Sequence, residues 1–115
     1  MARQIGLKQA MSIILTGRSV SAAEGARFGF VNEIVGASEL QHAVDRWCEQ
    51  ILKCAPLAIR ASKETVMRGL EEPGLADCIR NQETYPAFAS WKTAEDTLEG
   101  PRAFAEKRPP RWRGI

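Results

Sequence analysis

The stretch that decides the fold of this 115-residue chain is EDTLEGPRAFAEKRPPRWRG, which spans residues 95–114. It begins with an acidic helix start, passes through a Gly-Pro break, and predicts a short final helix with one aromatic residue and a basic end. Residues 101–115 hold five basic residues and one acidic residue, a net charge of +4, whereas the whole chain carries only +2. This concentration of positive charge at one end suggests an anionic partner.

Size and composition predict one globular domain at most. The chain is 44% hydrophobic and 26% charged, which is ordinary for soluble globular proteins. No apolar run approaches the roughly 20 residues that span a bilayer, and the first residues lack the apolar segment of a signal peptide. Three cysteines without CxxC spacing predict neither a disulfide framework nor a metal site. We therefore expect a cytoplasmic location.

The first thirty residues predict two helices. Apolar spacing favours a helix over residues 3–15, with Gly17 suited to the position just after its end. Ser21 and Glu24 have the spacing of a capping box, in which each side chain accepts a backbone N–H of the other residue. This box opens a short helix that we expect to end at Gly29.

The next segment predicts the one strand of the chain. Residues 30–35 are rich in β-forming side chains, although no second strand is evident to satisfy the hydrogen bonds of this one. A second capping box at residues 38–41 opens the helix with the most regular apolar stripe. Cys48 falls on that stripe, where a small buried side chain is the simplest interpretation.

The second half predicts helices separated by prolines. Pro56 fits the first turn of a helix that runs to about residue 70. A further helix spans about residues 75–90, and Pro86 should kink or shorten it. Residues 93–96 cap one more short helix, and Gly100-Pro101 begins the final one. The predicted fold class is mainly α, an irregular bundle of about six helical segments with one short strand.

A search for catalytic residues finds no complete set. His42 is the only histidine and lies on the polar side of its helix, so no metal cluster or nucleophile pair assembles around it. Glu95, Asp96 and Glu99 crowd one helix start, where capping by the helix dipole explains them better than acid–base chemistry. Lys63 has the pattern of a side chain whose stem packs and whose ammonium reaches solvent.

The basic tail allows three interpretations on its residues alone. It could be a solvated charged end, or it could bind nucleic acid through arginines interleaved with Phe104 and Trp112, although a +4 patch is weak for that role. It could also hold a small ligand that bears phosphate. Phe104 and Lys107 are three residues apart and would share one helical face, so a ring and an ammonium could hold adenine and phosphate together.

The order of motifs adds a resemblance. Along the tail stand Ser90, Asp96, Glu99-Gly100, Ala103-Phe104, Glu106-Lys107-Arg108, Pro109 and Gly114. Upstream stand Arg3-Gln4-Ile5-Gly6, Leu15-Thr16-Gly17-Arg18, Ser21-Ala22, Gly29-Phe30-Val31-Asn32, Ala55-Pro56 and Lys63. This order resembles the C-terminal portion of the enoyl-CoA hydratase/isomerase (crotonase) family, over nearly all of residues 3–114. Gly25, Phe30 and Pro101 depart from the residues that family members usually carry there.

The resemblance implies a fold and a division of the chain. Residues 1–36 would form the end of the crotonase spiral core, and residues 37–115 the C-terminal helical oligomerisation region. The family's oxyanion hole and acidic catalytic residues lie upstream of the matched part, so no catalytic residue can be assigned and we expect the chain alone to be inactive. Apolar surface that normally meets the rest of the core should then be exposed and promote self-association.

The resemblance also implies a substrate and two binding residues. Family members hydrate or isomerise the double bond of acyl-CoA thioesters without a separate cofactor, since coenzyme A is part of the substrate. Phe104 and Lys107 would contact the adenine and phosphate end of coenzyme A. The implied partners are acyl-CoA and further copies of the chain in a homo-oligomer, a trimer or hexamer in the family, with no nucleic acid and no membrane. The alternative is a non-catalytic helical binding or oligomerisation module.

Overall fold

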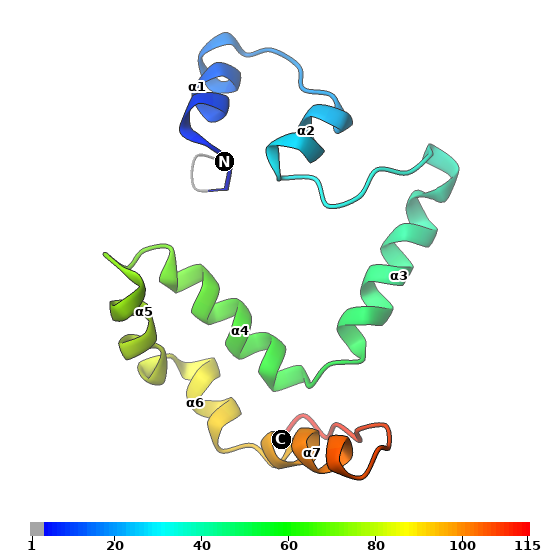
Figure 1. Ribbon diagram of the computed structural model, residues 1–115, viewed down its shortest axis with the longest axis vertical. Coiled ribbons are helices and arrows are strands. Elements are labelled where there is room, and N and C mark those ends of the chain that lie inside the picture. Colours follow the sequence, from blue (N-terminus) through cyan, green and yellow to red (C-terminus); the bar gives the residue numbers. More distant parts are fainter. Residues whose placement is uncertain (1–3) are drawn as a thin grey trace. The chain divides into compact units, whose positions relative to one another are not determined.

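The structure is a computed structural model that describes residues 4–115. In that range it forms seven α-helices and two short 3-10 helices, in the order drawn in Figure 1, and no β-strand. The predicted mainly helical fold is therefore confirmed. The chain divides into two compact units, one up to Val44 and one from Asp45 to Ile115. The predicted division into the end of the spiral core, residues 1–36, and a helical oligomerisation region, residues 37–115, stays a prediction.

The first unit contains α1 (Leu7–Thr16) and α2 (Ala22–Phe28). Both helices end where the sequence predicts, at Gly17 with φ of 61° and at Gly29 with φ of 88°. Glycine adopts this left-handed conformation without the steric cost that a side chain brings.

The predicted capping box at the start of α2 is confirmed. The Ser21 hydroxyl accepts the Glu24 backbone N–H at 3.2 Å, and the Glu24 carboxylate accepts the Ser21 N–H at 3.4 Å. Arg18 donates to the same carboxylate at 3.1 Å. The hydrogen bond from the Ser21 backbone, followed by the charge of Arg18, lowers the pKa of Glu24.

The predicted strand at residues 30–35 is wrong. The backbone N–H groups of Phe30 and Val31 both donate to the carbonyl of Gly25, at 3.1 and 3.3 Å, so the segment first folds back on α2. Residues 31–36 then continue without regular structure. A Cβ at Gly25 would lie 2.7 Å from Val31 Cγ2, which explains why glycine suits this position.

Helix α3 (Leu40–Leu52) confirms the predicted long amphipathic helix, but not its start or its burial. A 3-10 turn, η1 (Ala37–Glu39), precedes it and is capped by Gly36, so Ser38 lies inside the turn rather than at its cap. Cys48 is exposed, which corrects the prediction that it is buried. Four apolar residues of the stripe expose between 44 and 79% of their surface: Leu40, Val44, Ile51 and Leu52.

The second unit contains α4 (Pro56–Gly69), α5 (Leu75–Asn81), α6 (Pro86–Lys92) and α7 (Asp96–Ala105). Helix α4 packs chiefly against α6, and α5 joins them through a 3-10 turn, η2 (Gln82–Thr84), as Figure 1 shows. The buried apolar residues of this unit are mostly small: Ala55, Ala61, Tyr85, Ala94 and Ala103. The unit therefore has a thin core.

The two prolines fit the prediction unequally, because Pro86 does shorten the helix expected before it but also begins a new one. The helix expected over residues 75–90 is split, because Tyr85 is extended before proline and Pro86 then begins α6. Glu64 of α4 supports the new start by accepting the N–H of Ala87 at 2.7 Å. In contrast, Pro101 lies inside α7 and does not begin a new helix. A proline there removes one intrahelical hydrogen bond, and the helix continues through it.

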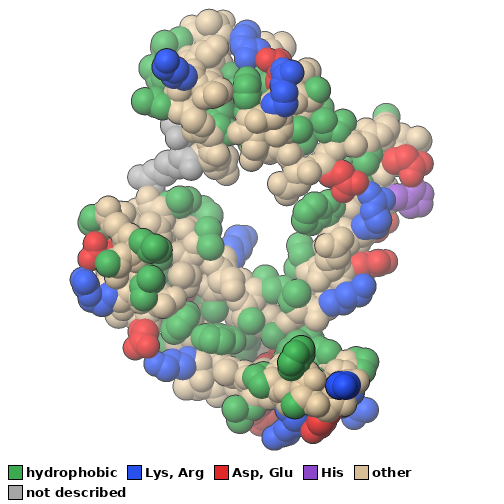
Figure 2. All heavy atoms as spheres, viewed as in Figure 1, with side chains coloured by type: hydrophobic (Ala, Val, Ile, Leu, Met, Phe, Trp, Pro, Cys, Tyr) green, Lys and Arg blue, Asp and Glu red, His purple; other side chains and the backbone are tan. Residues whose placement is uncertain are grey.

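Large apolar side chains lie widely on the surface, as Figure 2 shows for the face that it draws. Leu7, Ile14 and Leu15 of α1 expose 69, 58 and 73% of their surface, and Leu75 of α5 exposes 75%. The predicted exposed apolar surface is confirmed. Among residues 4–115, no helix combines the length and the apolar character needed to cross a membrane.

Candidate functional site

The C-terminal turn of α7 carries both residues that the resemblance singles out. The helix ends at Ala105, and the N–H of Arg108 donates to the carbonyl of Ala103 at 3.0 Å while that of Lys107 donates to Phe104 at 3.2 Å. This pair of bonds is a Schellman motif, which needs a left-handed residue at its centre. Lys107 is that residue, with φ of 51°.

A lysine at this position is unusual. In the described residues, Lys107 is the one non-glycine residue with positive φ, a conformation that costs a side-chain-bearing residue about 1–2 kcal/mol. The prediction that Phe104 and Lys107 share a helical face needs correction, because Lys107 lies in the turn beyond the helix. The turn nevertheless keeps the two residues three positions apart at one end of α7.

Phe104 and Lys107 both face solvent. Phe104 exposes 88% of its surface, while its neighbour Ala103 exposes 2%. An aromatic ring left this open contributes almost nothing to the core. No hydrogen bond or ion pair within residues 4–115 holds the Lys107 ammonium, which is also exposed. The ring and the ammonium are therefore both available to a ligand.

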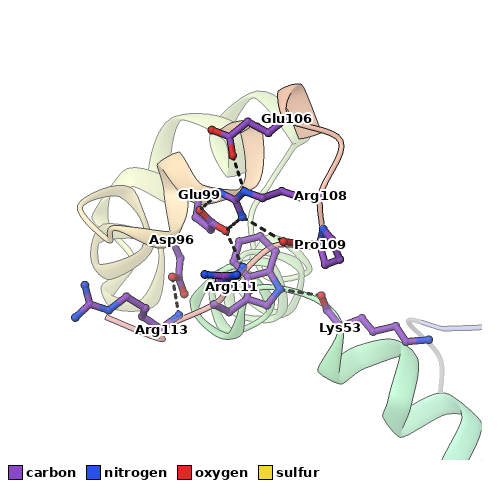
Figure 3. Close-up of polar contacts among 9 residues, drawn as sticks. Lys53, Asp96, Glu99, Glu106, Arg108, Pro109, Arg111 and Arg113 are labelled. Atoms are coloured by element: carbon purple, nitrogen blue, oxygen red, sulfur yellow. Dashed lines mark hydrogen bonds and ion pairs between the residues drawn. The ribbon is translucent and has the colours of Figure 1, made fainter. Parts of the chain in front are cut away.

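The next residue, Arg108, is held on two sides. Its guanidinium donates to both carboxylate oxygens of Glu99, at 2.6 and 3.0 Å, and its Nε donates to Glu106 at 2.5 Å (Figure 3). Glu99 also accepts the backbone N–H of Arg111 at 2.7 Å. The Arg108 hydrogen bonds, followed by that of Arg111, lower the pKa of Glu99 to about 2, and the same carboxylates raise the pKa of Arg108.

Asp96 binds the last residues of the tail. Its carboxylate, with only 3% of the residue exposed, accepts the backbone N–H groups of Arg113 and Gly114 at 2.8 Å each. Glu95 forms an exposed ion pair with the Arg113 side chain, and its N–H donates to Ile115 at 3.0 Å. The carboxylates at the start of α7 thus bind the returning tail. Asp96 and Glu99 lie in the first turn, as the dipole argument expects, but no side chain caps the helix by a hydrogen bond.

Trp112 fixes the tail at a third point. Its indole N–H donates to the carbonyl of Lys53, just after α3, at 2.8 Å (Figure 3). A Cβ at Gly100 would lie 3.4 Å from the Trp112 ring, so the ring packs closely on α7. We call Asp96, Glu99, Arg108 and Trp112 the tail clasp. It was not predicted from the sequence, because its partners are 9 to 59 residues apart.

The clasp changes how the tail charge is interpreted. Two of the five basic side chains in residues 101–115, Arg108 and Arg113, pair with Glu99 and Glu95, and Asp96 binds the backbone of the tail. A nucleic-acid site needs a basic surface that remains unpaired. The tail therefore presents less unpaired positive charge than its sequence alone indicates.

A second polar cluster joins α4, α5 and α6. The Tyr85 hydroxyl and the Asn81 amide donate to one oxygen of Glu72, at 2.9 and 3.0 Å, and the Arg68 guanidinium lies 5.0 Å from the Tyr85 ring centre. These bonds lower the pKa of Glu72, while burial and the bond to Glu72 raise that of Tyr85. The groups satisfy one another, so the cluster is best explained as packing.

The remaining candidates contribute no site. His42 and Lys63 are exposed on α3 and α4. No group of three or more His, Cys, Asp and Glu side chains in the described residues could hold a metal ion.

Comparison with known proteins decides the family. The family model described as enoyl-CoA hydratase/isomerase matches residues 1–114. The chain belongs to this family. It is 40% identical over 104 residues to a carnitinyl-CoA dehydratase of Salmonella typhi, and the match covers 89% of this chain and 40% of that protein.

Solved structures of the enoyl-CoA hydratase/isomerase family share the fold. An enoyl-CoA hydratase from Mycobacterium marinum has a TM-score of 0.88 at 31% identity, covering 100% of this chain and 44% of that one. An enoyl-CoA hydratase from Bacillus anthracis has a TM-score of 0.88 at 32% identity, covering 99% and 43%. The chain is thus a helical portion of the crotonase fold, and it spans about two fifths of the length of these relatives.

Proposed function

We propose that this chain supplies the C-terminal part of an enoyl-CoA hydratase/isomerase that acts on acyl-CoA thioesters. In this role it contributes oligomer contacts and part of the coenzyme A site, and the whole enzyme hydrates or shifts the double bond of an enoyl thioester. Its expected location is the cytoplasm. The family match over residues 1–114 supports the class of chemistry.

One observation carries the binding part of the proposal. Phe104 and Lys107 are exposed at one turn, and the lysine occupies a backbone conformation that glycine would adopt at lower cost. A residue that keeps a strained backbone conformation, although glycine would adopt it at lower cost, is often found at a functional site. An exposed ring offers a stacking surface for adenine, and an ammonium offers a point charge for phosphate.

Titration of the chain with coenzyme A, followed by amide chemical shifts, tests this site. We expect shifts centred on residues 103–108, and weaker binding in Phe104→Ala and in Lys107→Ala. Leu98→Ala is the matched control, because Leu98 is an apolar residue of the same helix with 68% exposure. Equal affinity in all four proteins would show that the assigned residues are wrong.

We propose further that the chain alone is not catalytic. The described residues offer no paired acid and base near the α7 turn, since its carboxylates are occupied by the tail. The purified chain should therefore not hydrate crotonyl-CoA above the uncatalysed rate. Hydration above that background would contradict this part of the proposal.

A second candidate is a helical oligomerisation module without chemistry, and the open apolar surface favours it. Besides the exposed side chains of α1 and α3, a pocket of about 310 Å³ opens between α4 and α6. Its lining is mostly apolar: Ala58, Ala61, Ser62, Thr65, Val66, Gln82, Phe88 and Trp91. Light scattering over a range of concentrations separates the candidates, because a strict monomer at high concentration would count against retained assembly.

A further inference from the structure

One part of the tail clasp, the pair of Glu99 and Arg108, fixes the residue that follows Lys107. Arg108 is held by Glu99 from the first turn of α7 and by Glu106 from the end of the same helix. Its backbone N–H is held by the carbonyl of Ala103. Side chain and backbone of Arg108 are thus both fixed on α7, and the chain must make its left-handed turn at the residue before it.

Two neighbouring cations at this turn have opposite surroundings. Arg108 is 30% exposed and meets two carboxylates, whereas no acidic group in residues 4–115 binds the exposed Lys107 ammonium. A two-pronged Arg–carboxylate pair fixes both distance and orientation. A lysine ammonium on a flexible stem fixes neither. The arrangement keeps one cation as an anchor and leaves the other for an outside anion.

We propose that Glu99 and Arg108 are positioning residues for acyl-CoA, because they hold the Lys107 turn in the conformation that presents its ammonium to the phosphate-bearing end of the ligand. This inference rests on the proposed function of the turn. Neither residue needs to touch the ligand. Without the pair, a lysine returns readily to right-handed backbone, and the ammonium leaves the position that the left-handed turn gives it.

The effect on affinity follows from the population of the turn. When only a fraction of molecules has the competent conformation, the apparent dissociation constant rises by the inverse of that fraction. If loss of the pair leaves about a tenth of the molecules in the left-handed turn, affinity for coenzyme A falls about tenfold.

Two measurements on the same proteins test the proposal. The first is amide hydrogen exchange at Arg108, whose N–H reports the turn without any ligand. The second is titration with coenzyme A. The variants are Glu99→Gln, which removes the charge at nearly constant shape, and Arg108→Lys, which keeps the charge but loses the two-pronged geometry. Glu95→Gln is the matched control. The Glu95 side chain, at the start of α7 and away from the turn, is 63% exposed and pairs with Arg113 of the tail.

We expect Glu99→Gln and Arg108→Lys to speed exchange at Arg108 and to weaken coenzyme A binding about tenfold, with no such change in Glu95→Gln. On a Lys107→Gly background, Glu99→Gln should cause no further loss of affinity, since the ammonium is already absent. A loss that persists on that background would overturn the proposal, because Glu99 would then act by another route.

The outcomes also separate the positioning role of Glu99 and Arg108 from the proposed coenzyme A site on which it rests. If the wild-type chain does not bind coenzyme A, the proposed function fails and the positioning role fails with it. If binding depends on Phe104 and Lys107 but not on Glu99 or Arg108, the proposed site stands and only the positioning role is refuted. If affinity falls while exchange at Arg108 is unchanged, the turn is not what Glu99 controls, and the proposal is again overturned.

Discussion

Helix α7 is joined to the tail by polar contacts, whereas helix α1 leaves an apolar face exposed. At α7, the carboxylates of Asp96 and Glu99 meet arginines or backbone N–H groups of the tail. At α1, the apolar face is exposed, with Ile14 and Leu15 at 58 and 73%. The polar interactions of the tail are completed within the chain, whereas the apolar face of α1 gains its burial only from another surface.

The difference indicates where each region draws its stability. Hydrogen bonds to a buried carboxylate act within a single chain. Apolar surface stabilises a fold only when it leaves water, at about 25 cal/mol per Å². A helical portion of a larger fold is expected to keep the first kind of contact and to lack part of the second. The exposed faces of α1 and α3 are the natural places for that missing contact.

The largest expected effect on stability is at Asp96. Asp96→Ala leaves two partly buried backbone N–H groups, those of Arg113 and Gly114, without their acceptor. We expect a loss of about 2–4 kcal/mol in the free energy of unfolding, measured by urea denaturation. Glu95→Gln, which alters an exposed ion pair one residue away, should cost less than about 0.5 kcal/mol. Similar losses in both variants would remove the distinction between buried and exposed carboxylates.

A smaller effect is expected at Trp112. Trp112→Phe keeps an aromatic ring near Gly100 but removes the indole donor to Lys53. The loss should be about 0.5–1.5 kcal/mol, seen as a lower urea midpoint at constant slope. A changed slope would show instead that the tail had detached and exposed further surface.

Glu99 should give the unfolding of the chain a pH dependence. Its folded pKa of about 2 lies below the ordinary 4.5, so the unfolded state binds more protons between these values and stability falls as pH falls. The contribution is complete above about pH 5 and disappears as pH approaches 2. Glu24 and Glu72, whose pKa values are also lowered, add to the same slope. In Glu99→Gln the acid-side slope should be reduced, and an unchanged slope would contradict the role of its pair with Arg108.

The smallest effect on stability is expected on the apolar face of α1. Leu15→Lys changes an exposed side chain, so the free energy of unfolding should move by no more than about 0.5 kcal/mol. Self-association should nevertheless decrease, as measured by light scattering. Gln9→Lys adds the same charge at an exposed polar position of the same helix. If both variants reduce association equally, net charge rather than the apolar face controls it.

The sequence predicted those parts of the fold that depend on near neighbours. The capping box of Ser21 and Glu24, the glycine end of α2 at Gly29 and the start of α4 at Pro56 all rest on backbone chemistry within four residues. The new helix at Pro86 and the unbroken helix through Pro101 were not predicted, because both depend on distant contacts. Glu64 supports a new helix at residue 86, whereas the clasp holds α7 together on both sides of Pro101.

The sequence singled out the residues of the candidate site, whose binding role stays a prediction, but not their geometry. The motif order identified Phe104 and Lys107, yet nothing in the local pattern places a lysine at φ of 51°. That conformation depends on Arg108 meeting a carboxylate nine residues away. The strand predicted at residues 30–35 failed for a related reason. Its side chains favour β-structure, but a strand needs a partner strand, and residues 4–115 contain no strand at all.

Hydrogen exchange across the whole chain tests the central claim most directly. Amides that open easily exchange fast, whereas those in well-supported structure are protected. We expect slow exchange at Arg108, Arg113 and Gly114, which the clasp and the α7 turn hold, and fast exchange throughout α1. Equal protection in both regions, or a tail that exchanges faster than α1, would contradict it.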